Sequence, residues 1–260
     1  MKQVSLAGRN IVVTGGTQGI GAQIARDAAG AGAAGICITG RNAANGAAMV
    51  GELQKLGAKA VFVTAELGIA AEVAAIVSAA LAAFGHVDGL ANAAGITDRG
   101  HIDDTSIELW DRMMAVNVRA PFILTQALVR HLRAVKKPGS IVNIITRSSH
   151  GGQPFLTAYS ASKGALATLT KNNAHALRAD RIRVNGVNIG WADTPGEHAI
   201  QARDGKPADW LRQSEPQQPF GRLIKPDDVS TLAVYLLSDA SVMMTGALID
   251  FDQNVMGAYD

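Results

Sequence analysis

The stretch Asn10-Ile-Val-Val-Thr14 runs directly into Gly15-Gly-Thr-Gln-Gly19-Ile-Gly21. A short apolar, β-branched run of this kind predicts a buried strand, and residues 22–31 after it predict a helix. Glycines in the turn between them let the backbone approach a pyrophosphate, while the helix N-terminus offers free N–H groups and positive partial charge. Glycine turns join many strands to helices, so the position between a strand and a helix is what favours nucleotide binding.

The rest of the chain continues this alternation. Further strands are expected at 34–39, 59–64, 87–92, 140–145, 181–187 and 247–251, and helices at 43–56, 70–84, 107–131, 158–179 and 226–237. The helix at 107–131 could be interrupted near Pro121. Strands separated by helices imply right-handed crossovers. The predicted fold class is therefore α/β, a Rossmann-like doubly wound parallel sheet of about seven strands with helices on both faces.

No linker, repeat or low-complexity segment divides the chain, so residues 1–260 are expected to form a single dinucleotide-binding and catalytic domain. Residues 189–220 contain four prolines and form a connection long enough to be a substrate loop. Ligands of parallel sheets bind beyond the carboxyl ends of the strands. The glycine loop, Gly40-Arg41, Glu66 and the segment 92–95 all follow such ends, which predicts one shared site.

Composition excludes several classes of protein. Apolar residues make up 48% and charged residues 18% of the 260 residues, which is typical of a globular chain. The formal net charge of +2 is dispersed and gives no reason to expect a nucleic acid partner. The single cysteine, Cys37, lies in an apolar run and is expected to be buried filler. With no apolar run of signal-peptide or membrane-spanning length, we expect a cytoplasmic protein.

The end of the second predicted strand bears on cofactor choice. In dinucleotide folds, the residue about 20 positions past the last glycine faces the adenosine ribose. A carboxylate there would bind the ribose hydroxyls and repel a 2′-phosphate. Here Gly40 brings no carboxylate, and Arg41 brings a guanidinium suited to a phosphate dianion. The sequence favours NADP over NAD, and the alternative is a solvated Arg41 at the head of the next helix.

The stretch Thr157-Ala-Tyr159-Ser-Ala-Ser-Lys163 lies in a run rich in good helix formers. On a helix this spacing puts Tyr159 and Lys163 on one face, one turn apart. A phenol loses its proton near pH 10, roughly, and a nearby ammonium favours the phenolate and lowers that pKa. Such a pair can move a proton to or from an alcohol or ketone oxygen, although the same spacing also occurs on ordinary exposed helix faces.

Taken in order, these motifs resemble those of the short-chain dehydrogenase/reductase family. The resemblance rests on Thr14-Gly15-x-x-x-Gly19-x-Gly21, Asn92-Ala-Ala-Gly95, Asn117, Tyr159-x-x-x-Lys163, and Asn185 through Gly190 to Thr194. It covers nearly the whole chain, and the motifs are specific in combination. It implies a single Rossmann-like domain, commonly assembled as a homotetramer with a homodimer as the alternative. It also implies hydride transfer between NAD(P) and an alcohol or carbonyl carbon.

The resemblance assigns a role to each matching residue. Tyr159 would be the general acid/base, Lys163 would lower its pKa and hold the nicotinamide ribose, and Asn117 would position a water linking Lys163 to solvent. Glu66 stands where the family usually has an Asp at the adenine, and Thr194 would bind the nicotinamide carboxamide. The expected cofactor contacts are Gly15, Thr17, Gly19, Ile20, Gly21, Arg41, Glu66, Leu67, Asn92, Gly95, Tyr159, Lys163, Ile189 and Thr194.

Several positions depart from the family pattern. The catalytic serine usually lies thirteen residues before the tyrosine, where this chain has Thr146. Threonine keeps the hydroxyl but is more restricted, and Ser148 is the substitute if the loop register differs. Ile189-Gly190 replaces the usual Pro-Gly after the sixth strand. The usual glycine-rich end after the last strand is Asp252-Gln-Asn-Val here.

The residues expected around the pocket favour a small polar substrate. Arg147, His150, Gln153, Trp191 and His198 would form a hydrogen-bonding wall suited to a sugar, polyol or hydroxy acid. Several of them could instead face solvent. The expected substrate contacts are Thr146, Ser148, His150, Gln153 and Trp191.

Other chemistries find less support. Ser148, Ser149 and His150 are adjacent, which rarely gives the geometry of a hydrolase, and no orienting acid is evident. The histidines show no metal-ligand spacing, so no metal site is expected. Two alternatives stay open, a 3-oxoacyl-thioester reductase and a non-catalytic dinucleotide-binding protein. The Asn117, Thr146, Tyr159 and Lys163 set argues against the second.

Overall fold

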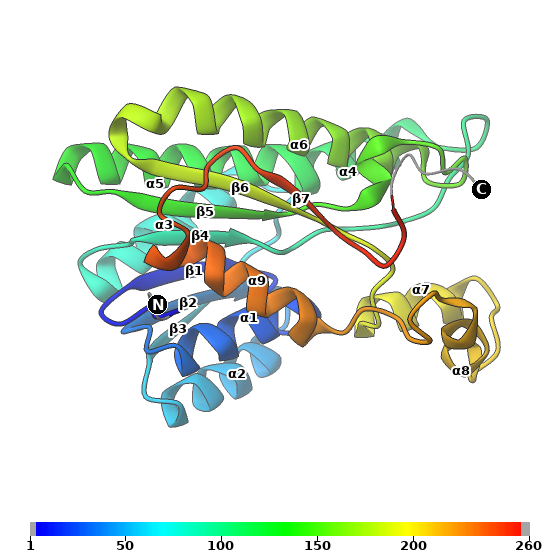
Figure 1. Ribbon diagram of the computed structural model, residues 1–260, viewed down its shortest axis with the longest axis horizontal. Coiled ribbons are helices and arrows are strands. Elements are labelled where there is room, and N and C mark those ends of the chain that lie inside the picture. Colours follow the sequence, from blue (N-terminus) through cyan, green and yellow to red (C-terminus); the bar gives the residue numbers. More distant parts are fainter. Residues whose placement is uncertain (1–3, 256–260) are drawn as a thin grey trace.

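The computed structural model describes residues 4–255 as alternating strands and helices (Figure 1). The strands are β1 (Asn10–Thr14), β2 (Gly35–Gly40), β3 (Lys59–Thr64), β4 (Gly89–Asn92), β5 (Gly139–Ile144), β6 (Ile182–Ile189) and β7 (Leu248–Phe251). The α-helices are α1 (Gly19–Gly30), α2 (Ala43–Lys55), α3 (Ala70–Phe84), α4 (Ile107–Met114), α5 (Ala120–Val135), α6 (Thr157–Leu177), α7 (Pro195–Arg203), α8 (Trp210–Ser214) and α9 (Pro226–Leu237).

All the strands pair in parallel in one seven-stranded sheet, in the order β3-β2-β1-β4-β5-β6-β7. The order of connection reverses between β1 and β4, so the loops after these strands diverge and leave a crevice at the carboxyl edge. This confirms the predicted fold class. The short apolar runs form strands because they are covered on both faces, as parallel sheets require.

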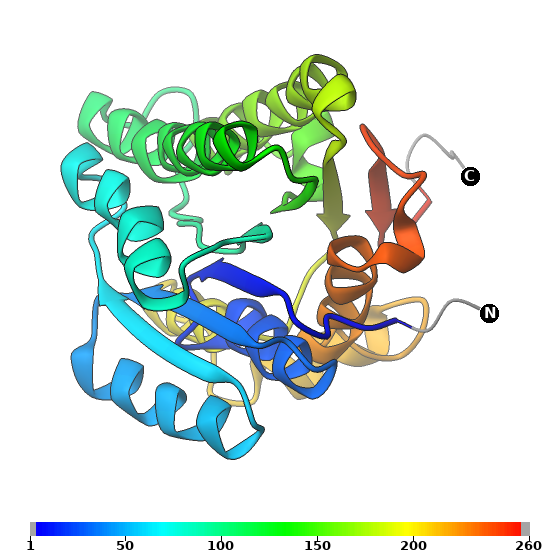
Figure 2. The ribbon, with the colours of Figure 1, turned by 90° about the vertical axis from the view of Figure 1, so that its left-hand side faces the viewer.

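Helices cover the two faces of the sheet in separate layers (Figure 2). In β1, Ile11 and Val13 point into the core formed with α1, α2 and α9, whereas Val12 points into the core formed with α3, α5 and α6. Each of these three side chains is at most 1% exposed. This alternation fixes the register of the strand, because a slip by one residue would turn every side chain to the opposite face of the sheet.

The predicted helix at 107–131 is interrupted, though not by Pro121. Residues Ala115–Arg119 form a π-helical segment between α4 and α5. Pro121 lies in the first turn of α5, where a missing N–H is tolerated. The predicted loop at 189–220 contains α7 and α8, which stand out from the body in Figure 1. None of the helices in residues 4–255 is long and apolar enough to cross a membrane.

Candidate active site

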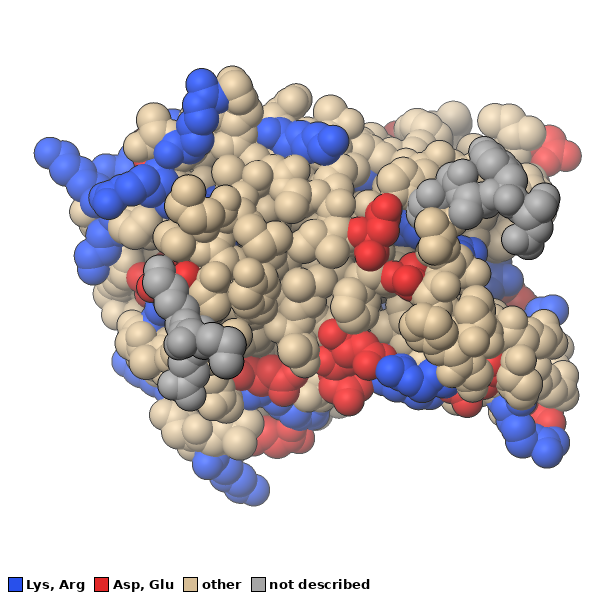
Figure 3. Space-filling model, viewed as in Figure 1, with Lys and Arg blue, Asp and Glu red and all other residues tan. Residues whose placement is uncertain are grey.

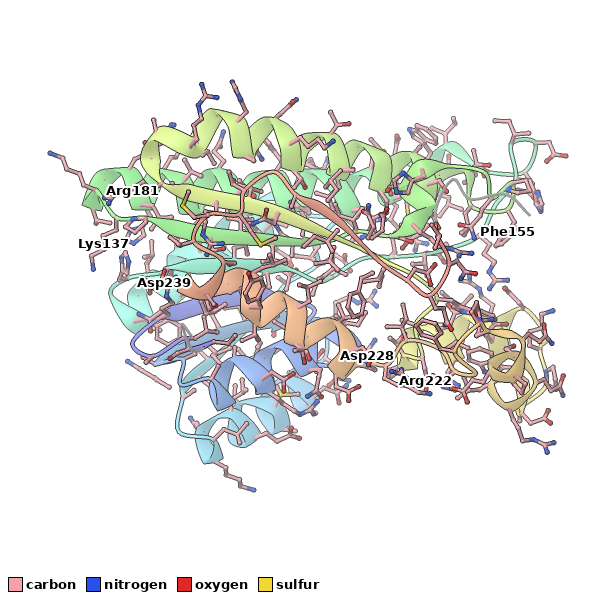
Figure 4. The ribbon with its side chains drawn as sticks, in the orientation of Figure 1. Lys137, Phe155, Arg181, Arg222, Asp228 and Asp239 are labelled. Atoms are coloured by element: carbon pink, nitrogen blue, oxygen red, sulfur yellow. The ribbon has the colours of Figure 1, made fainter. Side chains whose placement is uncertain are left out.

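A cleft of about 880 Å³ opens at the carboxyl edge of the sheet. One end is lined by the glycine loop after β1 and by the residues that follow β2 and β3. The other end is lined by Tyr159, by the loop after β5 and by α7 and α8. The segments that the sequence predicted to share a site therefore do share one. In Figure 4, Phe155 marks the rim of this region, beside α7 and α8.

The glycine loop approaches its own backbone too closely for side chains. A Cβ atom at Gly21 would lie 2.4 Å from the carbonyl oxygen of Gly15, and Gly15 itself has a φ of +66°. The hydroxyl of Thr14 accepts hydrogen bonds from the N–H groups of Ala93 and Ala94, both at 3.1 Å, which ties the loop after β4 to β1. The backbone surface and the N-terminus of α1 that this leaves in the cleft fit a pyrophosphate.

The end of β2 places a cation beside the same loop. The Arg41 side chain is 78% exposed, and its Nη1 atom lies 3.8 Å from Oε2 of Glu66. A Cβ at Gly40 would lie 2.8 Å from the hydroxyl of Thr17, so this strand end and the glycine loop are in contact. Among residues 4–255, the one ion pair of Arg41 is this loose, exposed contact with Glu66, and such a pair holds a side chain weakly.

Tyr159 and Lys163 lie one turn apart on α6 and are 9% and 4% exposed. The Nζ atom of Lys163 donates to the carbonyl oxygen of Ile144, at 2.8 Å, and lies 5.9 Å from the centre of the Tyr159 ring. Because α6 packs on β5 and β6, the pair is fixed against the sheet and directed into the cleft. The exposed-helix interpretation of this spacing does not apply.

Thr146 lines the same cleft as Tyr159, and its hydroxyl holds the pKa of the phenol below the value that burial alone would give. Its Oγ1 atom accepts from the N–H of Ser148, at 3.2 Å, and donates to the Ser148 hydroxyl, at 3.3 Å. The hydroxyl of Ser148 donates in turn to Oε1 of Gln153. Both hydroxyls line the cleft, and Thr146 is the one that acts on the Tyr159 pKa.

The expected lowering of the Tyr159 pKa is not what this structure gives. Burial is the main cause that raises the pKa of Tyr159 to about 12; the charge of Glu197 acts in the same direction, and the Thr146 hydroxyl opposes both. Burial also lowers the pKa of Lys163 to about 8. The Lys163 ammonium lies 5.9 Å from the centre of the Tyr159 ring in the same dry region, and desolvation is the main cause of both shifts. In this state the phenol is a proton donor at neutral pH.

Asn117 is fully buried in the π-helical segment and is satisfied on both sides of its amide. Oδ1 accepts from the N–H of Ile96 and Nδ2 donates to its carbonyl oxygen, each at 3.0 Å. Nδ2 also donates to the hydroxyl of Ser162, at 3.0 Å. A Cβ at Gly95 would lie 3.3 Å from both Asn117 Oδ1 and Lys163 Nζ, so these side chains flank Gly95 closely.

Some predicted site residues do not line the cleft. Asn92 is buried beneath it and donates to Oδ1 of Asn143, at 2.8 Å. The imidazole of His150 lies 3.2 Å from Oδ1 of Asp250, and that of His198 lies 2.7 Å from Oδ1 of Asp193. The prediction that these two histidines form part of the pocket wall was wrong, because each imidazole lies beside an aspartate outside the cleft. The other predicted cofactor and substrate residues line the cleft.

The lining residues that the sequence analysis missed include Arg99, Glu197 and Trp210. Trp191 and Trp210 stack with ring centres 5.6 Å apart. Glu197 accepts from Nε1 of Trp191, at 2.8 Å, and Arg99 lies over the Phe155 ring. Thr194-Pro-Gly-Glu197 has the spacing of a capping box with proline at the first helical position, and this signal could have predicted α7.

Asp252, which follows β7 where the family usually has a glycine-rich segment, connects several elements that surround the cleft. Asp252 has a side chain only 2% exposed, and Arg147, the residue after Thr146, donates to it at 2.8 Å. A Cβ at Gly190 would lie 2.1 Å from Oδ1 of Asp252. One buried carboxylate therefore joins the loop after β5, the end of β6 and the end of β7.

Comparisons with known proteins place the chain among oxidoreductases. A family model described as enoyl-(acyl carrier protein) reductase matches residues 15–253. The chain is 33% identical over 254 residues to 5-keto-D-gluconate 5-reductase of Escherichia coli K12, covering 98% of each chain. It is 33% identical over 249 residues to cis-4-hydroxycyclohexanecarboxylate dehydrogenase of Sinomonas cyclohexanicum, covering 95% of this chain and 96% of that protein.

Solved structures agree. A short-chain type dehydrogenase/reductase from Mycobacterium marinum superposes with a TM-score of 0.89 at 28% identity, covering 98% of each chain. A dehydrogenase/reductase from Sinorhizobium meliloti 1021 gives a TM-score of 0.85 at 34% identity, covering 97% of each. The chain belongs to the short-chain dehydrogenase/reductase family.

Proposed function

We propose that the protein is an NAD(P)-dependent alcohol dehydrogenase or carbonyl reductase in which Tyr159 is the general acid/base. The observation that carries this proposal is that Tyr159 and Thr146 line one cleft together with Lys163, one helical turn from Tyr159, and the Thr146 hydroxyl acts to lower the pKa of the Tyr159 phenol. A carbonyl oxygen placed between these two hydroxyls would meet a proton donor and a second hydrogen-bond donor at once.

The nicotinamide, when bound, supplies hydride to the reacting carbon or takes hydride from it. In the reductive direction Tyr159 gives its proton to the carbonyl oxygen, and the Thr146 hydroxyl stabilises the charge developing there. Lys163 would hold the nicotinamide ribose, and its ammonium stabilises the phenolate that Tyr159 becomes when its proton leaves. Asn117 holds the segment after Gly95 and positions a water linking Lys163 to solvent. Oxidation follows the same path reversed.

The proposed cofactor is NADP, with NAD as the alternative. Arg41 supports this preference because its exposed guanidinium follows β2 and lies beside the glycine loop. The position before it is Gly40 rather than the Asp or Glu that would repel a 2′-phosphate. Glu66 lies close enough to share Arg41 with a phosphate. A charge-assisted hydrogen bond from Arg41 to a 2′-phosphate would favour NADPH by about 1.5–3 kcal/mol, which is roughly tenfold to a hundredfold.

The proposed substrate is small and polar, a sugar, polyol or hydroxy acid. Glu197, Gln153 and Gln201 bring polar side chains to the cleft wall near Tyr159. Two relatives are named for 5-keto-D-gluconate and for cis-4-hydroxycyclohexanecarboxylate, and both names describe small oxygenated molecules. Turnover of apolar ketones alone in a substrate screen would count against this part of the proposal.

The alternative of a 3-oxoacyl-thioester reductase is in line with the acyl-carrier description of the matching family model. A carrier protein would need basic side chains around the mouth of the cleft. Arg99 and Lys206 line the cleft, and on the face shown in Figure 3 Lys and Arg lie at both ends of the molecule. Figure 4 labels Lys137 and Arg181 at the end remote from α7 and α8. The charges at the cleft are therefore compatible with a carrier protein, and acetoacetyl thioesters are the first competing substrates to test.

A homotetramer in the cytoplasm completes the proposal. Ile107, Trp110 and Phe122 on α4 and α5 are 70%, 37% and 45% exposed, and a second copy could cover these apolar side chains. Sedimentation velocity on the full chain would give the assembly state.

The test combines cofactor binding with turnover. We expect NADPH to bind more tightly than NADH when the quenching of tryptophan fluorescence is followed, and the difference to disappear in Arg41→Ser. Tyr159→Phe should lower turnover by at least about a hundredfold while the affinity for NADPH stays the same. Tyr235→Phe on α9 is the matched control, since its hydroxyl contacts only the sulfur of Met244 among the described residues. Full activity of Tyr159→Phe would refute the assignment.

A further inference from the structure

Glu197 is a carboxylate inside the cleft that the proposed proton transfer does not use. It lies in the first turn of α7, and its side chain is only 16% exposed. It lines the same cleft as Tyr159 and Thr146, and its negative charge makes a minor contribution to raising the pKa of the Tyr159 phenol. A substrate whose reacting carbon sits between Tyr159 and Thr146 would therefore occupy a cleft that also presents Glu197.

The two oxygens of Glu197 are used unequally. Oε1 accepts hydrogen bonds from Nε1 of Trp191, at 2.8 Å, and from Nε2 of Gln201, at 2.6 Å. Nη2 of Arg99 lies 3.7 Å from the same oxygen. Among residues 4–255, Oε2 receives none of these contacts. A carboxylate held by one oxygen presents the other as a fixed hydrogen-bond acceptor.

The positive charge beside Glu197 is shared between two carboxylates. Nη1 of Arg99 pairs with Oδ2 of Asp204, at 2.8 Å, and the guanidinium lies over the Phe155 ring. A substrate carboxylate at Arg99 would compete with Asp204 and Glu197 for one cation and would be repelled by both. A hydroxyl has no such conflict, because it can donate to a carboxylate oxygen without bringing charge. The stacked Trp191 and Trp210 add apolar ring surface to the same wall.

We propose that Oε2 of Glu197 accepts a hydrogen bond from a substrate hydroxyl next to the reacting carbon, so that the site selects neutral hydroxylated ketones and diols over carboxylates. This inference rests on the proposed function and narrows it, since it chooses sugars and polyols over hydroxy acids. Glu197 is then a specificity-determining residue that contacts substrate.

Glu197→Gln tests this assignment with almost no change in volume. If the amide oxygen keeps the bonds from Trp191 and Gln201, an NH₂ group replaces Oε2 and the acceptor is lost. Three ketones form a matched set, cyclohexanone, 2-hydroxycyclohexanone and 3-oxocyclohexanecarboxylate. The wild-type protein should reduce the hydroxyketone with a kcat/KM about tenfold to a hundredfold above that of cyclohexanone, the range for a hydrogen bond to a charged group.

In Glu197→Gln that advantage should fall to less than about threefold, mainly through KM, and kcat/KM for the carboxylate should rise. The alkaline limb of the pH profile should also move to lower pH, because a negative charge near Tyr159 has been removed. A purely structural role for Glu197 would lower all three activities equally and leave their ranking in place. Glu52→Gln on α2 is the control, because it removes an exposed carboxylate outside the cleft.

The proposed oxidoreductase function and the role of Glu197 can be refuted separately. Turnover of cyclohexanone that Tyr159→Phe abolishes would support the proposed function whatever the ranking of the ketones. If no ketone is reduced, binding of the three to NADPH-loaded Tyr159→Phe, with and without Glu197→Gln, gives the same comparison by tryptophan fluorescence. An identical ranking with and without Glu197→Gln would overturn the role of Glu197, and so would a wild-type preference for the carboxylate.

Discussion

Breaking the Arg147–Asp252 ion pair should destabilise the protein measurably. Asp252 has a side chain 2% exposed, and Nη1 of Arg147 lies 2.8 Å from its Oδ2 atom. Removing one partner of a fully buried pair typically costs about 3–5 kcal/mol, because it leaves an uncompensated charge. Arg147 is 33% exposed, so water can partly replace it, and Gln253 still donates its N–H to Asp252 at 2.8 Å. We therefore expect Arg147→Met to lower the free energy of unfolding by about 1–3 kcal/mol.

The magnitude can be checked by a double-mutant cycle. Arg147→Met should lower the melting temperature by about 3–10 °C for a chain of this size. Adding Asp252→Asn should recover part of that loss, with a coupling free energy of about 1 kcal/mol or more. The exposed pair Arg26–Glu52, with N···O 2.9 Å and side chains 38% and 48% exposed, is the matched control. Its coupling should stay below about 0.5 kcal/mol. Equal couplings in urea denaturation would refute the claim that burial makes the first pair important.

Two further predictions concern the site itself. Lys163→Met should stabilise the cofactor-free protein at pH 7 by up to about 3 kcal/mol, because a lysine whose pKa falls from 10.5 to about 8 on folding opposes folding while it is charged. The unfolded chain holds that proton up to about pH 10.5, so the stability advantage of Lys163→Met should shrink between about pH 8 and 10.5. Denaturation midpoints measured across that range would show this change. A constant advantage would contradict the reasoning. Gly21→Ala should weaken NADPH binding by at least about tenfold in fluorescence titration, because its Cβ would lie 2.4 Å from the Gly15 carbonyl oxygen; unchanged affinity would mean that the loop relaxes without cost.

The elements could be predicted closely because their signals are local. Residues 10–14 and 59–64 form strands with the predicted bounds, the first as a buried central strand and the second as a partly buried edge strand. Both runs are rich in β-branched and apolar residues. The shared site followed from topology alone, because every loop after a parallel strand emerges at the same edge. The spacing of Tyr159 and Lys163 fixed their common helix face in the same local way.

Contacts between distant residues could not be predicted. The Arg147–Asp252 pair joins residues 105 positions apart, and nothing in either segment alone indicates a partner. His150 was expected at the pocket, but its imidazole instead lies beside Asp250 on β7. The pKa of Tyr159 was misjudged for a related reason. The sequence indicated the ammonium nearby, whereas the burial that outweighs it is a property of the packed structure.

The π-helical segment at Ala115–Arg119 changes the direction in which side chains point between α4 and α5. A π-turn carries one residue more than an α-turn, so the side chains of α5 are rotated relative to those of α4. Asn117 lies at this shift, and its amide bonds Ile96 and Ser162 as well as Met113 in the turn before it. Chain length, as much as side-chain identity, therefore sets this part of the site. One residue fewer in the segment would keep the helix and turn the asparagine away.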